Sequence, residues 1–145
     1  MARFLTAADI VIVLSCPDVI GGPFQLQGFA AEDVFDTDNL AVAEVAMGVD
    51  GILSAGFVPR EVVQRYTLQA DSQSVDYFEA VYAQQVAQRS VYAFTGVLTL
   101  PAVGKTYNGS RGFLTGYSPT PAGRKILQPR QFAITWQSMS PGPSA

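Results

Sequence analysis

The sequence predicts a mostly β fold, flanked by one α-helix at about Val75–Gln88 and carrying a long apolar β-hairpin at about Leu40–Val58. Three observations lead to this prediction. Thirteen glycines and nine prolines divide the 145 residues into short pieces, which favours β-structure over a bundle of helices. Several pieces alternate apolar and polar residues with the period of two that a strand requires. Only the segment at Val75–Gln88 changes to the period of a helix.

The first part of the chain predicts a strand pair followed by an acidic loop. Ile10–Leu14 is a β-branched run, and a Gly-Gly-Pro turn separates it from the alternating segment Phe24–Phe29. We therefore expect these two segments to form a hairpin. Ala31–Asn39 carries four acidic residues and predicts an exposed loop, with Val34 and Phe35 tucked against the protein.

Leu40–Val58 predicts a hairpin that is apolar on both faces. Its turn contains Asp50-Gly51, a pair that accepts positive φ angles. A ribbon this apolar cannot solvate both of its faces, so two arrangements are open: a hairpin in the middle of the sheet, or one that projects and packs on another subunit. The second arrangement makes a subunit interface of Met47, Val49, Asp50, Ile52, Leu53, Phe57 and Val58.

The middle of the chain predicts a strand, the helix and a second strand. Val62–Ala70 alternates as an amphipathic strand does, and the polar residues 71–74 offer N-cap candidates. The apolar stripe of the helix that follows consists of Val75, Phe78, Val81, Tyr82 and Gln85. Ser90–Leu100 has almost no polar side chain on either parity and predicts a central strand that is covered on both faces.

The last third predicts two further hairpin strands, a closing strand and an irregular tail. Asn108–Gly112 is expected to be a five-residue hairpin loop, and residues 119–123 a second loop. Arg130–Gln137 predicts the closing strand, whose core face carries Phe132, Ile134 and Trp136. We expect a single domain over residues 1–145, with residues 1–7 and 138–145 as extended arms that become ordered on assembly.

Charge is distributed unevenly along the chain. All twelve acidic residues precede position 80 together with three basic residues, a net charge of −9, whereas the remainder carries six basic residues and no acid. This asymmetry suits self-assembly of an acidic surface on a basic one, although chance among so few charges explains it equally well. Charged residues make up only 14% of the chain, against about 25% in ordinary domains, which indicates that partners bury part of the exterior.

The residues required for common catalytic sites are missing from the sequence. The absence of histidine excludes a Ser-His-Asp triad and most zinc sites, and the lone Cys16 excludes an intrachain disulfide. The carboxylate pairs Glu32/Asp33 and Asp36/Asp38 lie in a polar loop, where such groups are usually only solvated. We therefore predict no enzymatic activity and no catalytic, cofactor-binding or metal-binding residues. No apolar run approaches the roughly 18 residues of a membrane span, so no membrane insertion is expected.

Two long segments, Met47–Ser74 and Leu98–Met139, resemble the inner tail-tube proteins of contractile-tailed bacteriophages in the order hairpin, strand, helix and closing strands. The type VI secretion inner tube shares this general fold. The resemblance implies a β-sandwich or small β-barrel flanked by one helix. It also implies hexameric rings that join their sheets into one inner barrel and stack into a tube in the virion tail, assembled in the host cytoplasm. The implied partners are other copies of the chain, the tail sheath, the baseplate, the tail terminator, and phage DNA that passes through the lumen without sequence-specific binding. Asp33, Asp36 and Asp38 would then face either the lumen or the sheath.

Two alternatives to a tube subunit remain. A tail terminator or baseplate ring subunit could share the fold and would stop at a single ring. A monomeric β-sandwich that binds carbohydrate would instead use exposed aromatic residues around the Asn108–Gly112 loop as its platform, namely Tyr107, Phe113 and Tyr117. The oligomeric state distinguishes these alternatives, because only a tube subunit polymerises.

Overall fold

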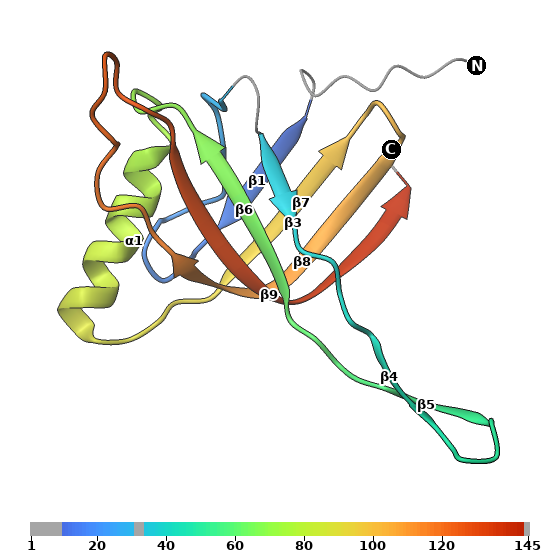
Figure 1. The fold of residues 1–145 in the computed structure, drawn as a ribbon. Coiled ribbons are helices and arrows are strands. Elements are labelled where there is room, and N and C mark those ends of the chain that lie inside the picture. Colours follow the sequence, from blue (N-terminus) through green and yellow to red (C-terminus); the bar gives the residue numbers. More distant parts are fainter. Residues whose placement is uncertain (1–9, 31–33, 144–145) are drawn as a thin grey trace.

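The computed structural model describes residues 10–30 and 34–143, which form a curled antiparallel sheet, one helix and a separate hairpin (Figure 1). The elements in chain order are β1 (Val11–Ser15), β2 (Phe24–Gln25), β3 (Phe35–Thr37), β4 (Ala43–Met47), β5 (Leu53–Phe57), β6 (Val62–Leu68), α1 (Val75–Gln88), β7 (Phe94–Leu100), β8 (Lys105–Gly116) and β9 (Arg130–Pro143). The mostly β fold with one helix is therefore confirmed, and the helix has its predicted bounds.

The main sheet has seven strands in the order β2-β1-β7-β8-β9-β6-β3, and it curls into a half-barrel with α1 beside it (Figure 1). All of its pairings are antiparallel. Hairpin β4–β5 is a sheet of its own and projects away from the half-barrel. This arrangement rules out the expectation that the apolar hairpin lies in the middle of the sheet.

The core lies on the side of the sheet that faces α1. Strand β6 alternates buried and half-buried residues along its whole length, as the period of two predicted. The helix contributes Val75, Phe78 and Val81 to the core, and the ring of Phe78 stacks on that of Phe132 with centroids 4.6 Å apart. Tyr82 belongs to the predicted apolar stripe but is exposed. Its ring stacks on that of Tyr117 with centroids 4.1 Å apart.

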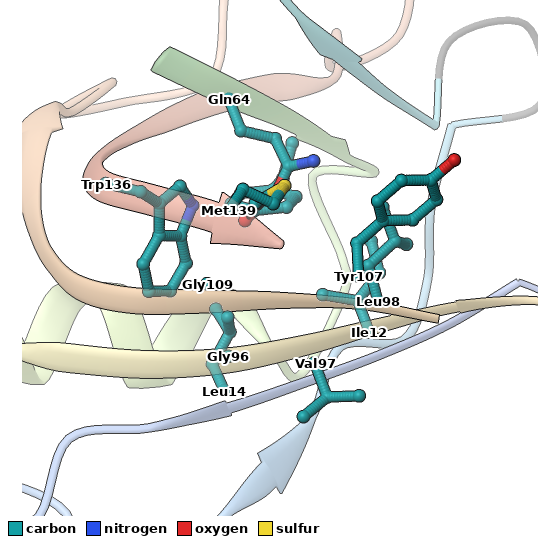
Figure 2. A pocket seen from close by; sticks show the side chains of 11 residues that line it. Ile12, Leu14, Gln64, Gly96, Val97, Leu98, Tyr107, Gly109, Trp136 and Met139 are labelled. Carbon is teal, nitrogen blue, oxygen red and sulfur yellow. Dashed lines mark hydrogen bonds between the residues drawn. The ribbon is translucent and has the colours of Figure 1, made fainter. Parts of the chain in front are cut away.

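The indole of Trp136 organises the centre of the half-barrel. It is 1% exposed and lies directly against the backbone of β7 and β8, where a Cβ on Gly96, Gly109 or Gly112 would overlap the ring (Figure 2). Gly109 and Gly112 are three residues apart, so a regular strand would turn them to opposite faces. Arg111, with a φ of 46°, lies between them at a point where the pairing with β7 shifts register, and this irregularity brings both glycines to the indole.

Strand β8 is therefore continuous from Lys105 to Gly116, and the predicted hairpin loop at Asn108–Gly112 is wrong. Glycines at these positions serve the close packing of the indole rather than a turn. Sequence patterns alone do not distinguish these two uses of glycine, because a turn with positive φ and a close packing contact both favour a residue without a Cβ atom.

Three further predictions are corrected by the structure. Residues Phe35–Thr37 of the expected acidic loop form the edge strand β3. Strand β7 begins only at Phe94 and is covered on one face, since Thr95 and Val97 on the other face are exposed. The tail from Ser138 onward continues β9 and pairs with Lys105–Ser110 of β8.

The strand structure of the tail has a physical explanation. Pairing between β6 and β9 ends at Trp136, so β9 beyond this point has a neighbour on one side only among the described residues. Proline is tolerated in a strand where the missing N–H would face an open edge, and Pro141 lies in this one-sided part of β9.

Two polar contacts attach α1 to the sheet. Arg130 at the start of β9 is 5% exposed, and its guanidinium donates to the Glu79 carboxylate at 2.8 Å and to the carbonyl oxygen of Ser118 at 2.7 Å. Directly before the first residue of the helix, the backbone N–H of Gln27 donates to the Ser74 hydroxyl at 2.8 Å. Ser74 is the N-cap residue, but its side chain makes no capping bond within the helix.

Candidate assembly surfaces

The β4–β5 hairpin is exposed along its entire length. Every residue of both strands is exposed, and the main sheet and α1 lie away from it (Figure 1). Large apolar side chains remain in contact with solvent on both faces of the ribbon; Phe57 is 80% exposed and Met47 66%. An isolated two-stranded hairpin is only marginally stable in water, and an apolar surface of this extent marks an interaction site.

The predicted interface residues all lie on this ribbon. Met47, Val49, Ile52, Leu53 and Phe57 are exposed. At the tip, one carboxylate oxygen of Asp50 accepts a hydrogen bond from the backbone N–H of Ile52 at 3.1 Å. Val58 is half-buried at the base of the ribbon, and its N–H donates to the carbonyl oxygen of Val42 at 2.9 Å. That a partner covers these residues stays a prediction.

One basic residue links the two sides of the hairpin at its base. The Arg60 Nε atom donates to the carbonyl oxygen of Ala41 at 3.1 Å, and an Arg60 nitrogen lies 3.5 Å from the Glu44 carboxylate. Both side chains are largely exposed, so the ion pair contributes little to stability. Its geometric effect is to hold the two strands together where they leave the half-barrel.

The main sheet is open rather than closed into a barrel. Its outermost strands, β2 and β3, have only two and three residues, and in the strand order they lie at opposite ends. The tail of β9 from Ser138 onward has a strand neighbour on one side only. Open edges of this kind can pair with another chain, so the sheet offers sites at which neighbouring copies can extend it.

The face of the sheet that points away from α1 is uncovered and poor in charge. Among the described residues that alternate with the buried core positions, Thr and Ser are frequent, as at Thr95, Ser110 and Thr115, all of which are exposed. Hydroxyl pairs cross neighbouring strands, with Ser110 and Ser138 2.6 Å apart and Thr115 and Thr135 2.8 Å apart. This surface is polar without presenting a cluster of cations.

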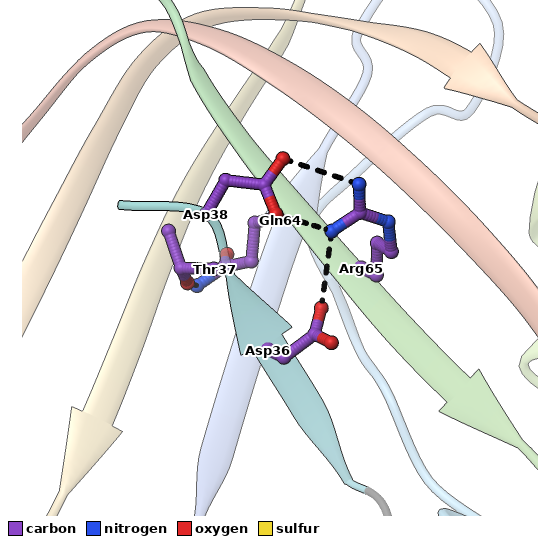
Figure 3. A network of polar contacts seen from close by, with 5 residues as sticks. All are labelled: Asp36, Thr37, Asp38, Gln64 and Arg65. Atoms are coloured by element: carbon purple, nitrogen blue, oxygen red, sulfur yellow. Dashed lines mark hydrogen bonds and ion pairs between the residues drawn. The ribbon is translucent and has the colours of Figure 1, made fainter. Parts of the chain in front are cut away.

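The acids Asp36 and Asp38 lie at one edge of this uncovered face. Arg65 on β6 donates to both oxygens of Asp38 at 2.7 and 3.1 Å and lies 3.5 Å from Asp36 (Figure 3). The hydrogen bonds from Arg65 lower the pKa of Asp38, and the same pairing raises the pKa of Arg65. The arginine therefore offsets part of the acidic charge here. The third predicted acid, Asp33, lies outside the described residues.

The central cavity of the half-barrel is too small for a small-molecule ligand. The cavity inside the half-barrel, lined by residues that include Gln64, Trp136 and Met139 (Figure 2), has no space for a water molecule. Within residues 10–30 and 34–143, no cluster of three or more metal-ligating side chains occurs, and no helix is long and apolar enough to span a membrane. Cys16 is buried, and burial raises the pKa of its thiol.

The predicted aromatic platform is not assembled. Tyr107 is half-buried and packs against the core, and Tyr117 stacks on Tyr82 of the helix. Phe113 instead lies beneath the Arg111 guanidinium, 5.8 Å from its ring centroid. Because the three rings have separate partners, they do not form one surface for a sugar.

The described residues thus form an open β-sheet domain with an uncovered apolar hairpin. The chain belongs to the family described as Tail fiber protein gp32, whose model matches residues 5–140. No curated protein matches the chain. The family and the fold together make it a phage tail-related structural protein.

Several solved structures of contractile injection systems contain chains of the same fold. A chain in the anti-feeding prophage baseplate superposes with a TM-score of 0.60 at 15% identity, covering 99% of this chain and 98% of that one. A chain in the cap that terminates the anti-feeding prophage tube superposes with a TM-score of 0.57 at 10% identity. The match covers 99% of this chain and 94% of that one. A chain in the sheath/tube terminator of an extracellular contractile injection system superposes with a TM-score of 0.56 at 11% identity. The match covers 97% of this chain and 98% of that one.

One surface was missed by the sequence-based reasoning. The loop between β8 and β9 exposes Ile126 and Leu127 directly after Arg124 and Lys125. The available signal was the run Arg-Lys-Ile-Leu within a segment otherwise rich in proline and glycine. Such a short run has no periodicity, so the sequence gives no reason to separate it from an ordinary surface loop.

Proposed function

We propose that the chain is a non-enzymatic structural subunit of a phage tail tube. Copies assemble into hexameric rings, and the rings stack into a tube whose lumen conducts the viral DNA during ejection. The observation that carries this proposal is the combination of an open half-barrel sheet with a fully exposed apolar hairpin. The first can be extended by a neighbour's strands, and the second can be buried by another chain.

The uncovered face of the sheet is suited to line the lumen. Its exposed hydroxyl and amide side chains can be hydrated. Its basic residue Arg65 is paired with Asp36 and Asp38, and Arg111 lies over the ring of Phe113. Proteins that hold nucleic acid do so by neutralising phosphates with Lys and Arg. A wall with few unpaired cations lets DNA slide past without sequence-specific binding, and in this arrangement Asp36 and Asp38 face the lumen rather than the sheath.

The comparisons support a ring-forming subunit. The similar baseplate chain belongs to an assembly with six-fold symmetry, and another chain of the same fold comes from a sheath-tube complex, with a TM-score of 0.57 and 11% identity. The partners in the tail would be the sheath, the baseplate and the tail terminator. Assembly would take place in the cytoplasm of the host.

A second candidate is a baseplate ring or tail terminator subunit. It is favoured by the similar chains that come from a baseplate, a cap and a sheath/tube terminator. Such a subunit would form one ring and stop. The tube is preferred because the hairpin and the loop around Ile126 leave exposed apolar surface at two distant parts of the molecule, which suits stacking in both directions.

Negative-stain electron microscopy of the purified chain at high concentration tests the proposal. Hollow tubes of stacked rings are the expected result. Single rings would replace the tube with the baseplate or terminator role, and thin fibres without a lumen would favour the tail fiber named in the family's description. A monomer at every concentration would overturn the assembly role altogether.

A further inference from the structure

The loop between β8 and β9 presents a second exposed apolar patch, and its shape is fixed. Ile126 is 74% exposed and Leu127 61%. The N–H of Gln128 donates to the carbonyl oxygen of Ala122 at 2.9 Å, and Gly123 and Leu127 form an isolated antiparallel bridge. The patch is therefore the tip of a small closed turn rather than an extended segment.

This turn forms one wall of an open groove of about 740 Å³. The opposite wall comes from the segment between β6 and α1, and the lining residues are Gln69, Ala70, Asp71, Arg124, Lys125, Ile126, Leu127 and Pro129. The lining thus combines two cations and one acid with apolar side chains. Within the part of the chain that the structure describes, neither Arg124 nor Lys125 forms an ion pair.

The β4–β5 hairpin has the complementary character. Leu40–Val58 contains the acids Glu44 and Asp50 and no basic residue, and Asp50 lies at the tip beside the exposed Val49 and Ile52. The hairpin and the 124–127 turn lie at opposite ends of the molecule (Figure 1). A chain that carries two complementary surfaces at opposite ends can associate head to tail, which gives a repeating assembly rather than a closed pair.

We propose that the hairpin tip of one copy, Val49–Ile52, docks into the groove beside Arg124–Leu127 of the next copy. This inference rests on the proposed function, since it requires that the chain assembles, and it names the contact that joins successive copies. A symmetric contact of hairpin on hairpin is disfavoured because it would bring two Asp50 carboxylates together. Docking into the groove instead places Asp50 near two unpaired cations and buries apolar side chains on both partners.

Site-directed disulfide cross-linking tests this contact. Two full-length single variants, Val49→Cys and Ile126→Cys, are mixed at assembly concentration and mildly oxidised. We expect a covalent heterodimer at least tenfold in excess of either homodimer. The native Cys16 is 0% exposed, so it contributes little background. A matched control replaces Ile126→Cys with Thr95→Cys, an exposed position on the uncovered face of the sheet, and should give no heterodimer.

The outcomes separate this inference from the proposed function. Rings or tubes in the electron microscope without the heterodimer would overturn the docking contact and leave the tail role intact. An excess of Val49–Val49 homodimer would show a two-fold contact and also overturn it. Absence of both assemblies and cross-links would overturn both proposals together.

A charge variant provides an independent check of the same groove. Lys125→Glu is expected to weaken association at least several-fold at low salt, and the difference from the native chain should shrink as salt screens the charges. Lys105→Glu makes the same change in charge at an exposed position outside the groove and should have little effect. An equal loss in both variants would show that net charge, not this groove, controls association.

Discussion

Two regions of this molecule are rich in apolar residues and opposite in environment. The strands that face α1 bury their apolar residues, with Ile134, Phe132 and Tyr66 at 0% exposure. The β4–β5 hairpin is also rich in apolar residues, yet all of its strand positions are exposed. The difference lies in which faces are apolar: on β6 and β9 the outer face carries polar residues such as Arg65 and Thr135, whereas the hairpin is apolar on both faces and has no covering layer among the described residues.

This contrast indicates that the two regions respond differently to mutation. Changes on the α1 side should lower the free energy of unfolding of the single chain. Changes in the hairpin should leave this free energy nearly unchanged and affect association instead. The variants below test the division, beginning with the largest expected effect on folding.

Trp136→Ala is expected to destabilise the folded chain by about 3–5 kcal/mol, because it leaves a cavity at the centre of the half-barrel. Its counterpart in the hairpin, Phe57→Ala, should change the unfolding free energy by no more than about 0.5 kcal/mol, as exposed substitutions usually do. Urea unfolding at a concentration where the chain is monomeric measures both. A similar loss of unfolding free energy in both variants would contradict the division between a stabilising core and a hairpin that affects association.

Gly112→Ala is expected to cost about 1–3 kcal/mol, because the added methyl group overlaps Trp136 and Ile134 and the core must shift. Gly21→Ala is the matched control, since a Cβ there meets nothing within 4 Å, and it should lie within about 0.5 kcal/mol of the native chain. Thermal unfolding of both variants gives the comparison. A harmless Gly112→Ala would mean that the indole does not need this close approach.

Glu79→Ala is expected to cost about 1–3 kcal/mol, because the buried Arg130 guanidinium loses its charged acceptor. Arg130→Met should cost less, since the Glu79 side chain is 48% exposed and remains hydrated without its partner. Denaturant titration of the two variants gives the unfolding free energy lost when either residue of the ion pair is removed. The reverse order would indicate that the cation stacked near Phe132 and Tyr117, rather than the ion pair, dominates this contact.

The triple variant Met47→Ser, Val49→Ser and Phe57→Ser is expected to unfold like the native chain, within about 0.5 kcal/mol per substitution, and to lose assembly into rings or tubes. Analytical ultracentrifugation at high concentration measures the second effect. Val97→Ser, a partly exposed change on the uncovered face of the sheet, should assemble normally. Assembly of the triple variant at native concentration would remove the hairpin from the interface.

The smallest effect concerns the exposed Asp38–Arg65 pair. Arg65→Gln is expected to raise the pKa of Asp38 toward its ordinary value, because the two hydrogen bonds that lower it are lost. In the native chain, a lowered folded-state pKa contributes stability that is present above the unfolded-state pKa and is lost as the pH falls through the folded-state value. Carboxyl chemical shifts followed by NMR between neutral and acidic pH give the pKa directly. An unchanged midpoint would contradict the pairing.

Much of the fold followed from local pattern. The helix has the predicted bounds because its period, its first-turn acid and the polar residues before it agree. Strand β6 and the core face of β9 were predicted from strict alternation, and the apolar hairpin from its Asp-Gly turn. The interface residues could be selected as candidates because no monomer solvates such a ribbon on both faces, although only an experiment on assembly can establish their partner.

The predictions failed where distant residues decide the local structure. Asn108–Gly112 contains turn residues, but the indole of Trp136 packs against its glycines, and β8 continues through the region with an irregularity at Arg111. Residues 138–143 look irregular, but β8 supplies a partner along their whole length. The groove beside Arg124–Leu127 is formed by two segments about fifty residues apart in the sequence. The residue pattern of either segment alone therefore does not predict it.

The sequence by itself determined the secondary structure with strong periodicity, the side of β6 and of β9 that is buried, and the presence of a ribbon that is apolar on both faces. These features follow from neighbouring residues and the geometry of the backbone. The tertiary structure alone decided that the ribbon projects, that the sheet stays open with one uncovered face, and that a basic apolar groove lies at the far end from the acidic hairpin tip. Those properties depend on which segments meet in space, and local periodicity contains no information about such meetings.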